Sequence, residues 1–440
     1  MDSEMEIDDL DQTVVNMVDA STMNGTENTT KKASSSSGPL TPKEALFYYR
    51  NILTPYEQRE CSDYPEIYFV GEGADKVKKG KHNHGFDTTS RSYIAHTHDH
   101  IAYRYELVKL LGKGYSSAVY VGYDHKTNTK VALKIFRADR KCKLLAAQEE
   151  NILRHLNETY GSDDSDGNII RLIDAFTFRR HRVLVLERLY LNLYDFVKHL
   201  PNQMLGPVKV RAIAQSFLKA LIVLNKEKIV HCDLKPENVM FRQEGRTGIK
   251  LVDFGTSCRV GQQTHDYIGS RYYRAPEIVL GLGYDCASDM WSYGCILLEL
   301  LIGFPFFYAD SEQALLALMI EALGLPPTKM VEACRNVGQG EDKGQVFAAH
   351  FLPDGSPRCL SLTAHHTLDE PAPEGAEPRH VVIKAPKSRP VKKVLAHCKN
   401  PMVVDFIERC LEWEPSKRMT PLQAHVHPWI KLTPVRTPEN

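Results

Sequence analysis

The sequence has no excess of charge of either sign. Its 440 residues contain 55 Lys and Arg side chains and 55 Asp and Glu side chains, so the formal net charge is zero. A chain with balanced charge has no overall field that would attract nucleic acid or anionic lipid. We therefore expect neither nucleic-acid binding nor membrane binding by the chain as a whole.

Paired cysteines and long apolar runs are also missing. The ten cysteines are scattered and include no CxxC spacing, which indicates reduced thiols rather than a disulfide framework. The longest apolar stretch is interrupted by Glu299 and Pro305, so it is too short and too polar to span a bilayer. The acidic start MDSEMEIDDL is unlike a secretory signal peptide. These features predict the cytoplasm or nucleus, and nothing in the sequence indicates an oligomeric state.

The chain is too long for one hydrophobic core, so we expect two lobes with flanking segments. Residues 1–39 are rich in Asp, Glu, Ser, Thr and Asn and are predicted to be a disordered tail. Residues 40–100 form an ordered accessory region, with Pro42 in a first helical turn, a strand in DYPEIYFVG and a loop at 72–92. Residues 434–440 are a second tail.

The rest of the chain divides by periodicity. Residues 101–186 contain short β-rich runs and one amphipathic helix, whereas residues 187–433 have mainly helical spacing. Within the second part, residues 331–395 are irregular and are expected to loop over the surface. The predicted fold class is α+β, with a small β-rich lobe and a larger helical lobe.

A glycine-rich motif lies in the first lobe. It reads Gly112, Lys113, Gly114, Tyr115, Ser116, Ser117, Ala118, Val119. Glycines in a hairpin let backbone N–H groups approach phosphates closely. Ser117 stands where a third glycine is expected, and the motif alone is equally compatible with a tight hairpin that binds nothing.

Lys134 follows in VALK on a predicted strand, where its ammonium group can meet nucleotide phosphates. The amphipathic helix after it offers Glu149 as the carboxylate that holds Lys134, with the adjacent Glu150 as the alternative.

The most specific signal is HCDLKPEN, residues 231–238, followed by the DFG sequence at 253–255 and APE at 275–277. This order matches the protein kinase template, in which Asp233 orients and accepts the hydroxyl proton. Asn238 and Asp253 would hold Mg²⁺, and Lys235 would neutralise charge on the transferred phosphoryl group. Each aspartate alone would more often be a turn or cap residue, but the combination overrides that interpretation.

The sequence resembles the dual-specificity tyrosine-regulated kinases, a family of the CMGC group of protein kinases. The resemblance lies in HDHIAYRYE at 98–106, in HCD with Cys232 in place of arginine, and in the segment LTPKEALFYYRNILTPYEQRE with YPEIYFVG, which is similar to the accessory region of class II members. It implies a bilobal protein kinase fold that binds ATP and Mg²⁺. It also implies protein substrates with a Ser or Thr followed by Pro, and an upstream Arg.

The resemblance also implies the nucleotide contacts. The expected ATP-binding residues are Leu111, Gly112, Lys113, Gly114, Tyr115, Ser116, Ser117, Val119, Ala132, Lys134, Leu186, Glu187 and Leu189. Leu186 is the expected gatekeeper, and Glu187 and Leu189 would contact adenine through their backbone.

Tyr267 in THDYIGSRYYRAPE matches the activation-loop tyrosine of the family. Cys232 cannot carry a positive charge, so another anchor is needed for a phosphorylated loop. We predict autophosphorylation at Tyr267, with Arg271 and Arg274 holding the phosphate. Arg274 also matches the arginine that favours Pro after the target residue. The loop departs from the family pattern at His265 and Gly269.

Three other interpretations remain open. The chain could be a pseudokinase or scaffold, for which Ser117 and the insert at 331–395 are the only support. Histidines near residues 82–84, 96–100 and 365 could bind a transition metal, although no cysteines accompany them. The lysine-rich run at 76–81 is better explained as a solvated linker than as a phosphate or nuclear-import site.

Overall fold

The structure of the chain is a computed structural model that describes residues 38–77, 80–161, 167–263, 267–338, 342–361 and 385–432. The described chain divides after Leu189 into two compact units, which we call the N-terminal unit and the C-terminal unit. The predicted disordered tail falls almost wholly outside the described residues, as do residues 434–440.

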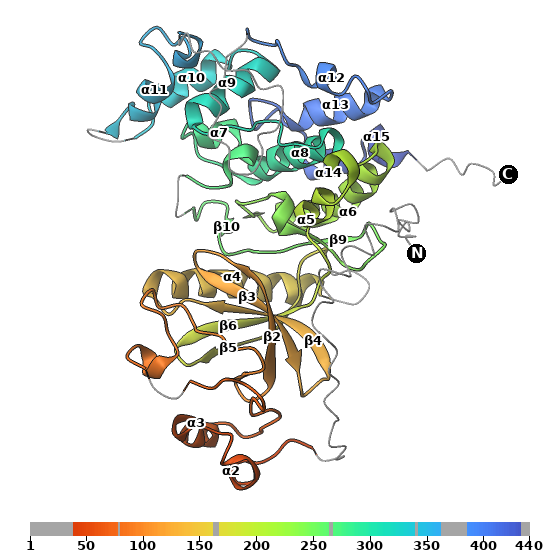
Figure 1. The fold of residues 1–440 in the computed structure, drawn as a ribbon. Coiled ribbons are helices and arrows are strands. Elements are labelled where there is room, and N and C mark those ends of the chain that lie inside the picture. The colour runs from red at the N-terminus through yellow and green to blue at the C-terminus, as the bar shows by residue number, and fades with distance from the viewer. Residues whose placement is uncertain are drawn as a thin grey trace, which may run out of the picture. The chain divides into compact units, whose positions relative to one another are not determined.

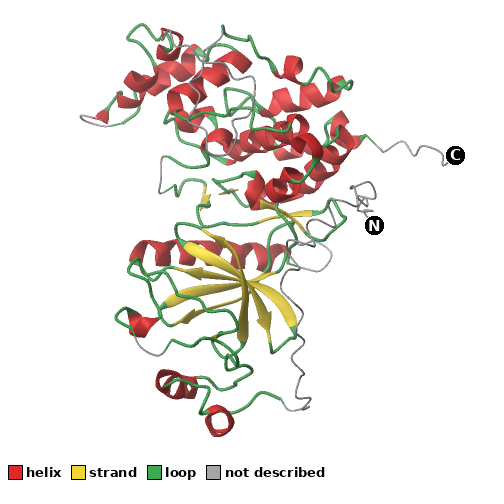
Figure 2. Ribbon diagram, viewed as in Figure 1, coloured by secondary structure: helices red, strands yellow, loops and turns green. Residues whose placement is uncertain are grey.

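The N-terminal unit is built on a six-stranded antiparallel sheet with the strand order β1-β2-β3-β4-β6-β5 (Figure 2). The strands are β1 (His100–Ile101), β2 (Tyr105–Lys113), β3 (Ser117–Asp124), β4 (Thr129–Phe136), β5 (Leu172–Phe178) and β6 (His181–Glu187). The central strands β4 and β6 are buried along most of their length, as expected for apolar runs covered on both faces.

One long helix, α4 (Arg140–Tyr160), packs against β4, β5 and β6 (Figure 1). Asp139 caps its first turn by accepting a hydrogen bond from the Cys142 N–H. Its buried residues recur at helical spacing and form a stripe toward the sheet, namely Cys142, Ala146, Glu149, Ile152, Leu153 and Leu156. The predicted β-rich part with one helix is confirmed.

The accessory region contains two short helices, α2 (Pro42–Tyr49) and α3 (Pro55–Glu60). Each begins with a Thr-Pro pair, and in each the threonine forms a capping box with the glutamate three residues later. The strand predicted for DYPEIYFVG is wrong. Only Ile67 pairs with another segment, at Leu40, because the Tyr68 and Phe69 N–H groups both donate to the carbonyl of Tyr103 instead of to a ladder.

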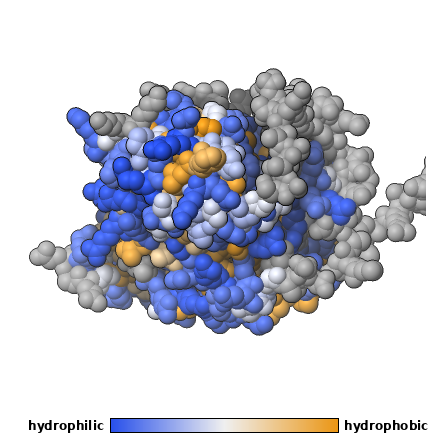
Figure 3. Space-filling view, turned by 90° about the horizontal axis from the view of Figure 1, so that it is seen from below, coloured by the Kyte–Doolittle hydropathy of each residue, from blue (hydrophilic) through white to orange (hydrophobic). Residues whose placement is uncertain are grey.

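The face on which α2 and α3 lie is mainly hydrophilic, with a small apolar patch (Figure 3). Phe47 and Tyr48 of α2 are among the exposed large hydrophobic side chains, and their rings meet edge to face. Ala45, on the other side of α2, is buried in a small core with Leu53 and Tyr103. The accessory region therefore has a core of its own beside the sheet.

The C-terminal unit is mainly helical, as predicted (Figure 1). Its helices are α5 (Leu193–Lys198), α6 (Pro207–Lys226), α7 (Pro276–Val279), α8 (Cys286–Ile302), α9 (Glu312–Leu323), α10 (Thr328–Arg335), α11 (Gln345–His350), α12 (Val391–Val394), α13 (Pro401–Cys410), α14 (Pro421–His425) and α15 (Pro428–Lys431). Its short strands are β7 (Ile229–Val230), β8 (Val239–Phe241), β9 (Ile249–Leu251) and β10 (Cys258–Arg259). Helices α6 and α8 pack together around buried apolar side chains, and α13 packs on α8.

The irregular surface loop predicted for residues 331–395 is wrong for the described parts of that range. The end of α10 and all of α11 and α12 lie in it, and α10 buries Met330, Val331 and Cys334 on one face. The His-, Pro- and Glu-rich stretch lies within residues 362–384, outside the described residues. Among the described helices, none combines the length and apolar character needed to cross a bilayer.

Candidate active site

The glycine-rich motif forms the β2–β3 hairpin of the N-terminal unit. Gly112 pairs with Val119, and the Gly114 N–H donates to the carbonyl of Ser117 at 2.9 Å. A Cβ on Gly112 would meet no atom within 4 Å, and one on Gly114 would only touch the Ser117 oxygen at 3.8 Å. Neither glycine has a positive φ, so the hairpin itself does not require them. The two glycines leave the backbone of the hairpin open to close approach.

Lys134 lies on β4 opposite Val119 and forms an ion pair with Glu149 of α4. Its Nζ lies 2.7 Å from both carboxylate oxygens of Glu149. Glu149 reaches the sheet because it lies on the buried stripe of α4. Glu150 instead pairs with Arg182 and Arg154, so the alternative partner considered from the sequence is excluded.

Other expected nucleotide contacts lie on β4 and on the neighbouring strands, or just after β6. Ala132 on β4 pairs with Leu186 on β6, and both side chains are buried. Glu187 ends β6; its backbone N–H donates to the carbonyl of Arg171 at 3.0 Å, and its side-chain carboxylate accepts a hydrogen bond from the Arg171 N–H at 2.6 Å. Leu111 is exposed on β2, and Leu189 is buried.

Asp233 of the HCDLKPEN segment accepts three hydrogen bonds, two from Ser270 and one from Lys235. Its Oδ1 accepts hydrogen bonds from the Ser270 N–H at 3.0 Å and the Ser270 hydroxyl at 2.8 Å. Its Oδ2 accepts from Lys235 Nζ at 2.7 Å. Burial opposes the charge of Lys235, but the carboxylate of Asp233 outweighs it and raises the pKa of Lys235. Asp233 is therefore fixed in orientation beside a permanent positive charge.

Asn238 and Asp253 provide oxygen ligands of the kind that Mg²⁺ prefers. The Asn238 amide donates to the carbonyl of Asp233 at 2.8 Å, which fixes the amide nitrogen and leaves its oxygen as the group available to a metal. Asp253 is exposed and has a φ of 64°, a left-handed conformation that is uncommon for non-glycine residues but that Asp adopts more readily than most. The next residue, Phe254, is fully buried against His231. These residues fit a magnesium ion.

Asp289 of α8 braces this loop. Its carboxylate accepts hydrogen bonds from the backbone N–H groups of His231 and Cys232 at 2.7 and 3.2 Å. Burial raises the pKa of Asp289 to about 7, although the two backbone bonds act in the opposite direction. Cys232 has a φ of 71°, so the chain turns sharply just before Asp233.

Cys232 itself is a buried, neutral thiol. It lies 3.7 Å from the sulfur of Cys258 and donates to the carbonyl of Val230. The hydrogen bond with Cys258 and burial both raise the pKa of Cys232. The structure therefore agrees with the sequence argument that this position cannot hold a phosphate by charge. All ten cysteines of the chain are buried and have free thiols.

The activation segment brings Tyr267 to Arg274. The Arg274 guanidinium lies 3.9 Å from the ring centroid of Tyr267 and donates to its hydroxyl. The other predicted arginine, Arg271, donates to the carbonyl of Asp310 at 2.6 Å. Glu312 pairs with Arg274 at 3.2 Å, a partner that the sequence did not indicate. His265 lies outside the described residues, and Gly269 has a φ of 79° that favours glycine.

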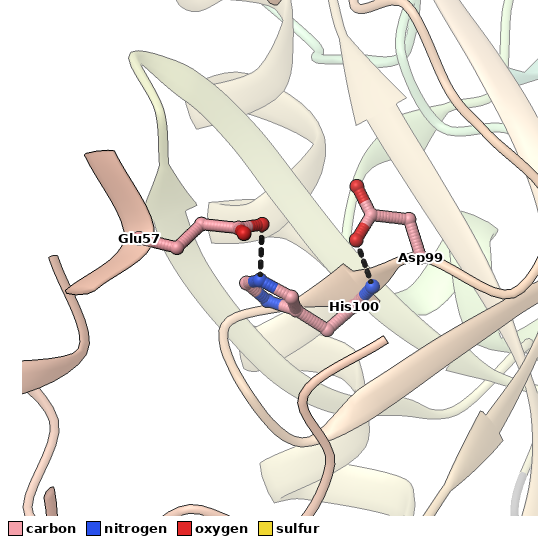
Figure 4. Close-up of side chains that lie close together, drawn as sticks. All are labelled: Glu57, Asp99 and His100. Atoms are coloured by element: carbon pink, nitrogen blue, oxygen red, sulfur yellow. Dashed lines mark hydrogen bonds and ion pairs between the residues drawn. The ribbon is translucent and has the colours of Figure 1, made fainter. Parts of the chain in front are cut away.

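A second cluster of charged groups lies in the accessory region, where His100 meets Glu57 and Asp99 (Figure 4). One potential ligand atom from each lies within 4.8 Å of the others, the spacing of a metal site. However, Glu57 Oε1 accepts hydrogen bonds from Lys76 at 2.9 Å, His100 at 3.0 Å and Arg179 at 3.2 Å. Two cationic side chains therefore already compensate the carboxylates, and the cluster is an ion network.

This network corrects one prediction and reveals residues that the sequence did not single out. Lys76 is not a solvated linker residue, since its side chain is only 7% exposed. Arg179, in the turn between β5 and β6, is fully buried and also binds Glu60. Burial without partners would be prohibitive for these charges, so the network ties the accessory region to the β5–β6 hairpin. Lys78 and Lys79 lie outside the described residues.

Comparison with known proteins agrees with this geometry. Residues 105–430 match the protein kinase domain family. The chain is 42% identical over 413 residues to dual specificity tyrosine-phosphorylation-regulated kinase 3 of Macaca fascicularis, covering 92% of this chain and 70% of that protein. The Homo sapiens protein of the same name is also 42% identical over 413 residues, covering 92% and 68%. A putative homolog in Drosophila melanogaster is 40% identical over 405 residues, covering 91% and 47%.

The chain belongs to the dual-specificity tyrosine-regulated kinase family. It is a protein kinase of the CMGC group, and the α+β protein kinase fold predicted from the sequence is confirmed. A member of this family uses ATP as a substrate and acts on proteins. Sequence motifs did not indicate three residues that contact the candidate site or the accessory network, because only tertiary contacts reveal them: Ser270, Glu312 and Arg179.

Proposed function

We propose that the chain is an active kinase that transfers the γ-phosphate of ATP to Ser or Thr residues followed by Pro, and that it phosphorylates its own Tyr267. The observation that carries this proposal is the fixed orientation of Asp233 between Ser270 and Lys235. A carboxylate held in this way can orient a substrate hydroxyl and accept its proton.

The N-terminal unit would contribute binding and charge. Lys134, held by Glu149, would bind the α- and β-phosphates, and the N–H groups of the glycine-rich hairpin would approach the phosphates. In the C-terminal unit, Asn238 and Asp253 would hold Mg²⁺, which would neutralise phosphate charge. Lys235 would stabilise the charge on the phosphoryl group while Asp233 takes the proton.

Arg274 supports a preference for proline after the acceptor residue. Its guanidinium donates to the carbonyls of Ile268 and Gly269 at 2.9 and 2.6 Å. With both carbonyls engaged, a substrate N–H next to them would have no acceptor, and proline has no N–H to leave unsatisfied. Glu237 is exposed two residues after Lys235, and its carboxylate would favour a basic residue elsewhere in the substrate.

Regulation by Tyr267 is supported by the contact with Arg274 that already exists before modification. Phosphate on this tyrosine would add roughly −1.5 to −2 charge beside a guanidinium. The accessory helices α2 and α3 support assignment to class II of the family. We also propose that the protein acts in the cytoplasm or nucleus, in agreement with its free thiols.

A kinase assay with phosphosite mapping on the wild-type chain and Asp233→Asn tests the proposal. We expect ATP turnover, a Ser/Thr-Pro pattern on a peptide array and phosphate on Tyr267 of bacterially expressed protein. Removing a catalytic base of this kind lowers the rate by about 10²–10⁴-fold. Asp354→Asn, at an exposed aspartate of the same unit, is the matched control and should remain fully active.

The alternative is a pseudokinase or scaffold, favoured only by Ser117 in the glycine-rich motif and by the insert at 331–395. Wild-type protein that binds ATP without turning it over would support that alternative and overturn the proposal. A fully active Tyr267→Phe protein with no tyrosine phosphate in the wild type would overturn the regulatory part alone.

A further inference from the structure

The tip of the glycine-rich hairpin is tied to Arg137, the residue that follows β4. The Arg137 backbone N–H donates to the carbonyl of Ser116 at 2.9 Å. Its guanidinium donates to the carbonyl of Tyr115 at 3.2 Å and lies 5.3 Å from the centroid of the Tyr115 ring. One residue therefore engages two consecutive carbonyls and the side chain at the tip.

These bonds fix the direction of the N–H groups as well. In a trans peptide the C=O and the N–H of the next residue point in opposite directions. The Tyr115 carbonyl faces Arg137, so the Ser116 N–H points away from Arg137. The Ser116 carbonyl also faces Arg137, so the Ser117 N–H points away from it as well. Within the described chain, no acceptor takes the N–H of Tyr115 or Ser116.

The guanidinium is itself held in place. Its Nε donates to the carbonyl of Ser90 at 3.1 Å, and Asp139, the cap of α4, pairs with it at 3.2 Å. The backbone N–H of Ala138 also donates to the carbonyl of Arg91. Arg137 thus connects the hairpin tip to the accessory region and to the start of the helix that carries Glu149.

We infer that Arg137 is a positioning residue for the nucleotide: by holding the carbonyls of Tyr115 and Ser116, it aims the N–H groups of the hairpin tip at the phosphates of ATP. This inference rests on the proposed function. It also explains how the hairpin functions with Ser117 in place of the third glycine. Ser117 gives the backbone less conformational freedom than a glycine would. Because Arg137 already fixes the orientation of the peptide groups at the hairpin tip, that freedom is not needed.

A comparison of ATP and adenosine binding tests the inference, because only ATP has phosphates. We expect Arg137→Met to weaken Mg²⁺–ATP binding, measured by calorimetry, by about fivefold, the effect of losing one hydrogen bond. Adenosine binding should stay unchanged, and the KM for ATP should rise while the KM for a peptide substrate does not. Arg137→Lys, which keeps the charge and one donor group, should recover part of the affinity.

Lys141→Met is the matched control. Lys141 Nζ lies 5.5 Å from the same Tyr115 ring, yet it makes no hydrogen bond to the hairpin backbone. If positive charge near the tip were the cause, both variants would weaken ATP binding equally, and the inference would be wrong. It would also be overturned by equal losses of ATP and adenosine affinity in Arg137→Met. Wild-type protein that binds no ATP would overturn the proposed function, and this inference with it.

Discussion

The fold does not require glycine at positions 112 and 114. A positive φ favours glycine at many other glycine positions, whereas Gly112 and Gly114 have ordinary φ values and open space where a side chain would lie. Structural and functional reasons for glycine can therefore be separated by substitution.

We predict that Gly112→Ala leaves thermal stability within about 0.5 kcal/mol of the wild type, since no strain or clash arises. The same change should weaken ATP binding by about tenfold, the loss of one hydrogen bond to a charged phosphate. Gly73→Ala is the control with the opposite result. Its φ of 87° makes alanine strained, so stability should fall while ATP affinity does not change. A loss of stability in Gly112→Ala would contradict the argument.

At the scale of elements, the accessory region is held to the sheet by the ion network around Glu57. His100 accepts a hydrogen bond from the Tyr103 N–H through Nδ1, so its Nε2–H donates to Glu57. Burial opposes the charge of Glu57, but His100, Lys76 and the Thr54 N–H outweigh it and lower the pKa of Glu57 below its ordinary value of 4.5.

Glu57→Gln should lower the free energy of unfolding by about 3–5 kcal/mol at pH 7, because it leaves buried cations without their carboxylate. A group whose pKa is lowered in the folded state stabilises it above the unfolded pKa and loses this effect as pH falls. The difference between wild type and variant should therefore be constant from pH 7 to about 5 and shrink toward pH 3.5. Urea unfolding at several pH values measures it.

The matched control is Glu66→Gln, whose ion pair with Lys126 is exposed and screened by solvent, so its loss should have little effect on stability. A Glu57→Gln effect that was as small as this, or that did not depend on pH, would show that the network does not hold the accessory region.

The sequence predicted most elements but not how the accessory region attaches. Short β-rich runs and helical spacing indicated the sheet, α4 and the helical unit, and the kinase motifs indicated Lys134 and Asp233. The predicted strand near Ile67 failed because its N–H groups find a single carbonyl on a distant segment. Lys76 looked like a solvated residue because its partners, Glu57 and Arg179, are distant in sequence. Local patterns cannot show such contacts.

At the scale of the whole molecule, the end of the chain completes the C-terminal unit. Arg418 lies 141 residues after Glu277, and their side chains form two hydrogen bonds at 2.8 and 2.9 Å while both are buried. Arg418 also donates to the carbonyls of Ala287 and Glu412. The APE motif and the start of α8 are therefore held by a residue near the end of the described chain.

Arg418→Met should lower the free energy of unfolding by about 3–5 kcal/mol, because Glu277 remains buried without its partner. The thermal unfolding temperature should fall as well. Arg409→Met, which breaks the exposed pair with Asp405, should change stability by no more than about 1 kcal/mol. Calorimetry of both variants checks the prediction. Similar unfolding temperatures for the two would show that the ion pair contributes little.

The helix caps of the chain affect which of its own threonines a kinase could phosphorylate. Three of its Thr-Pro dipeptides, at Thr41, Thr54 and Thr420, fit the proposed substrate preference, yet each threonine caps a helix and accepts a hydrogen bond from its first turn. At Thr41 and Thr54 the hydroxyl also donates to the glutamate three residues later, whose negative charge would repel a phosphate. The proline that would make each threonine a target is also the first residue of the helix that the threonine caps, so under the proposed function folding would protect these sites from the enzyme itself.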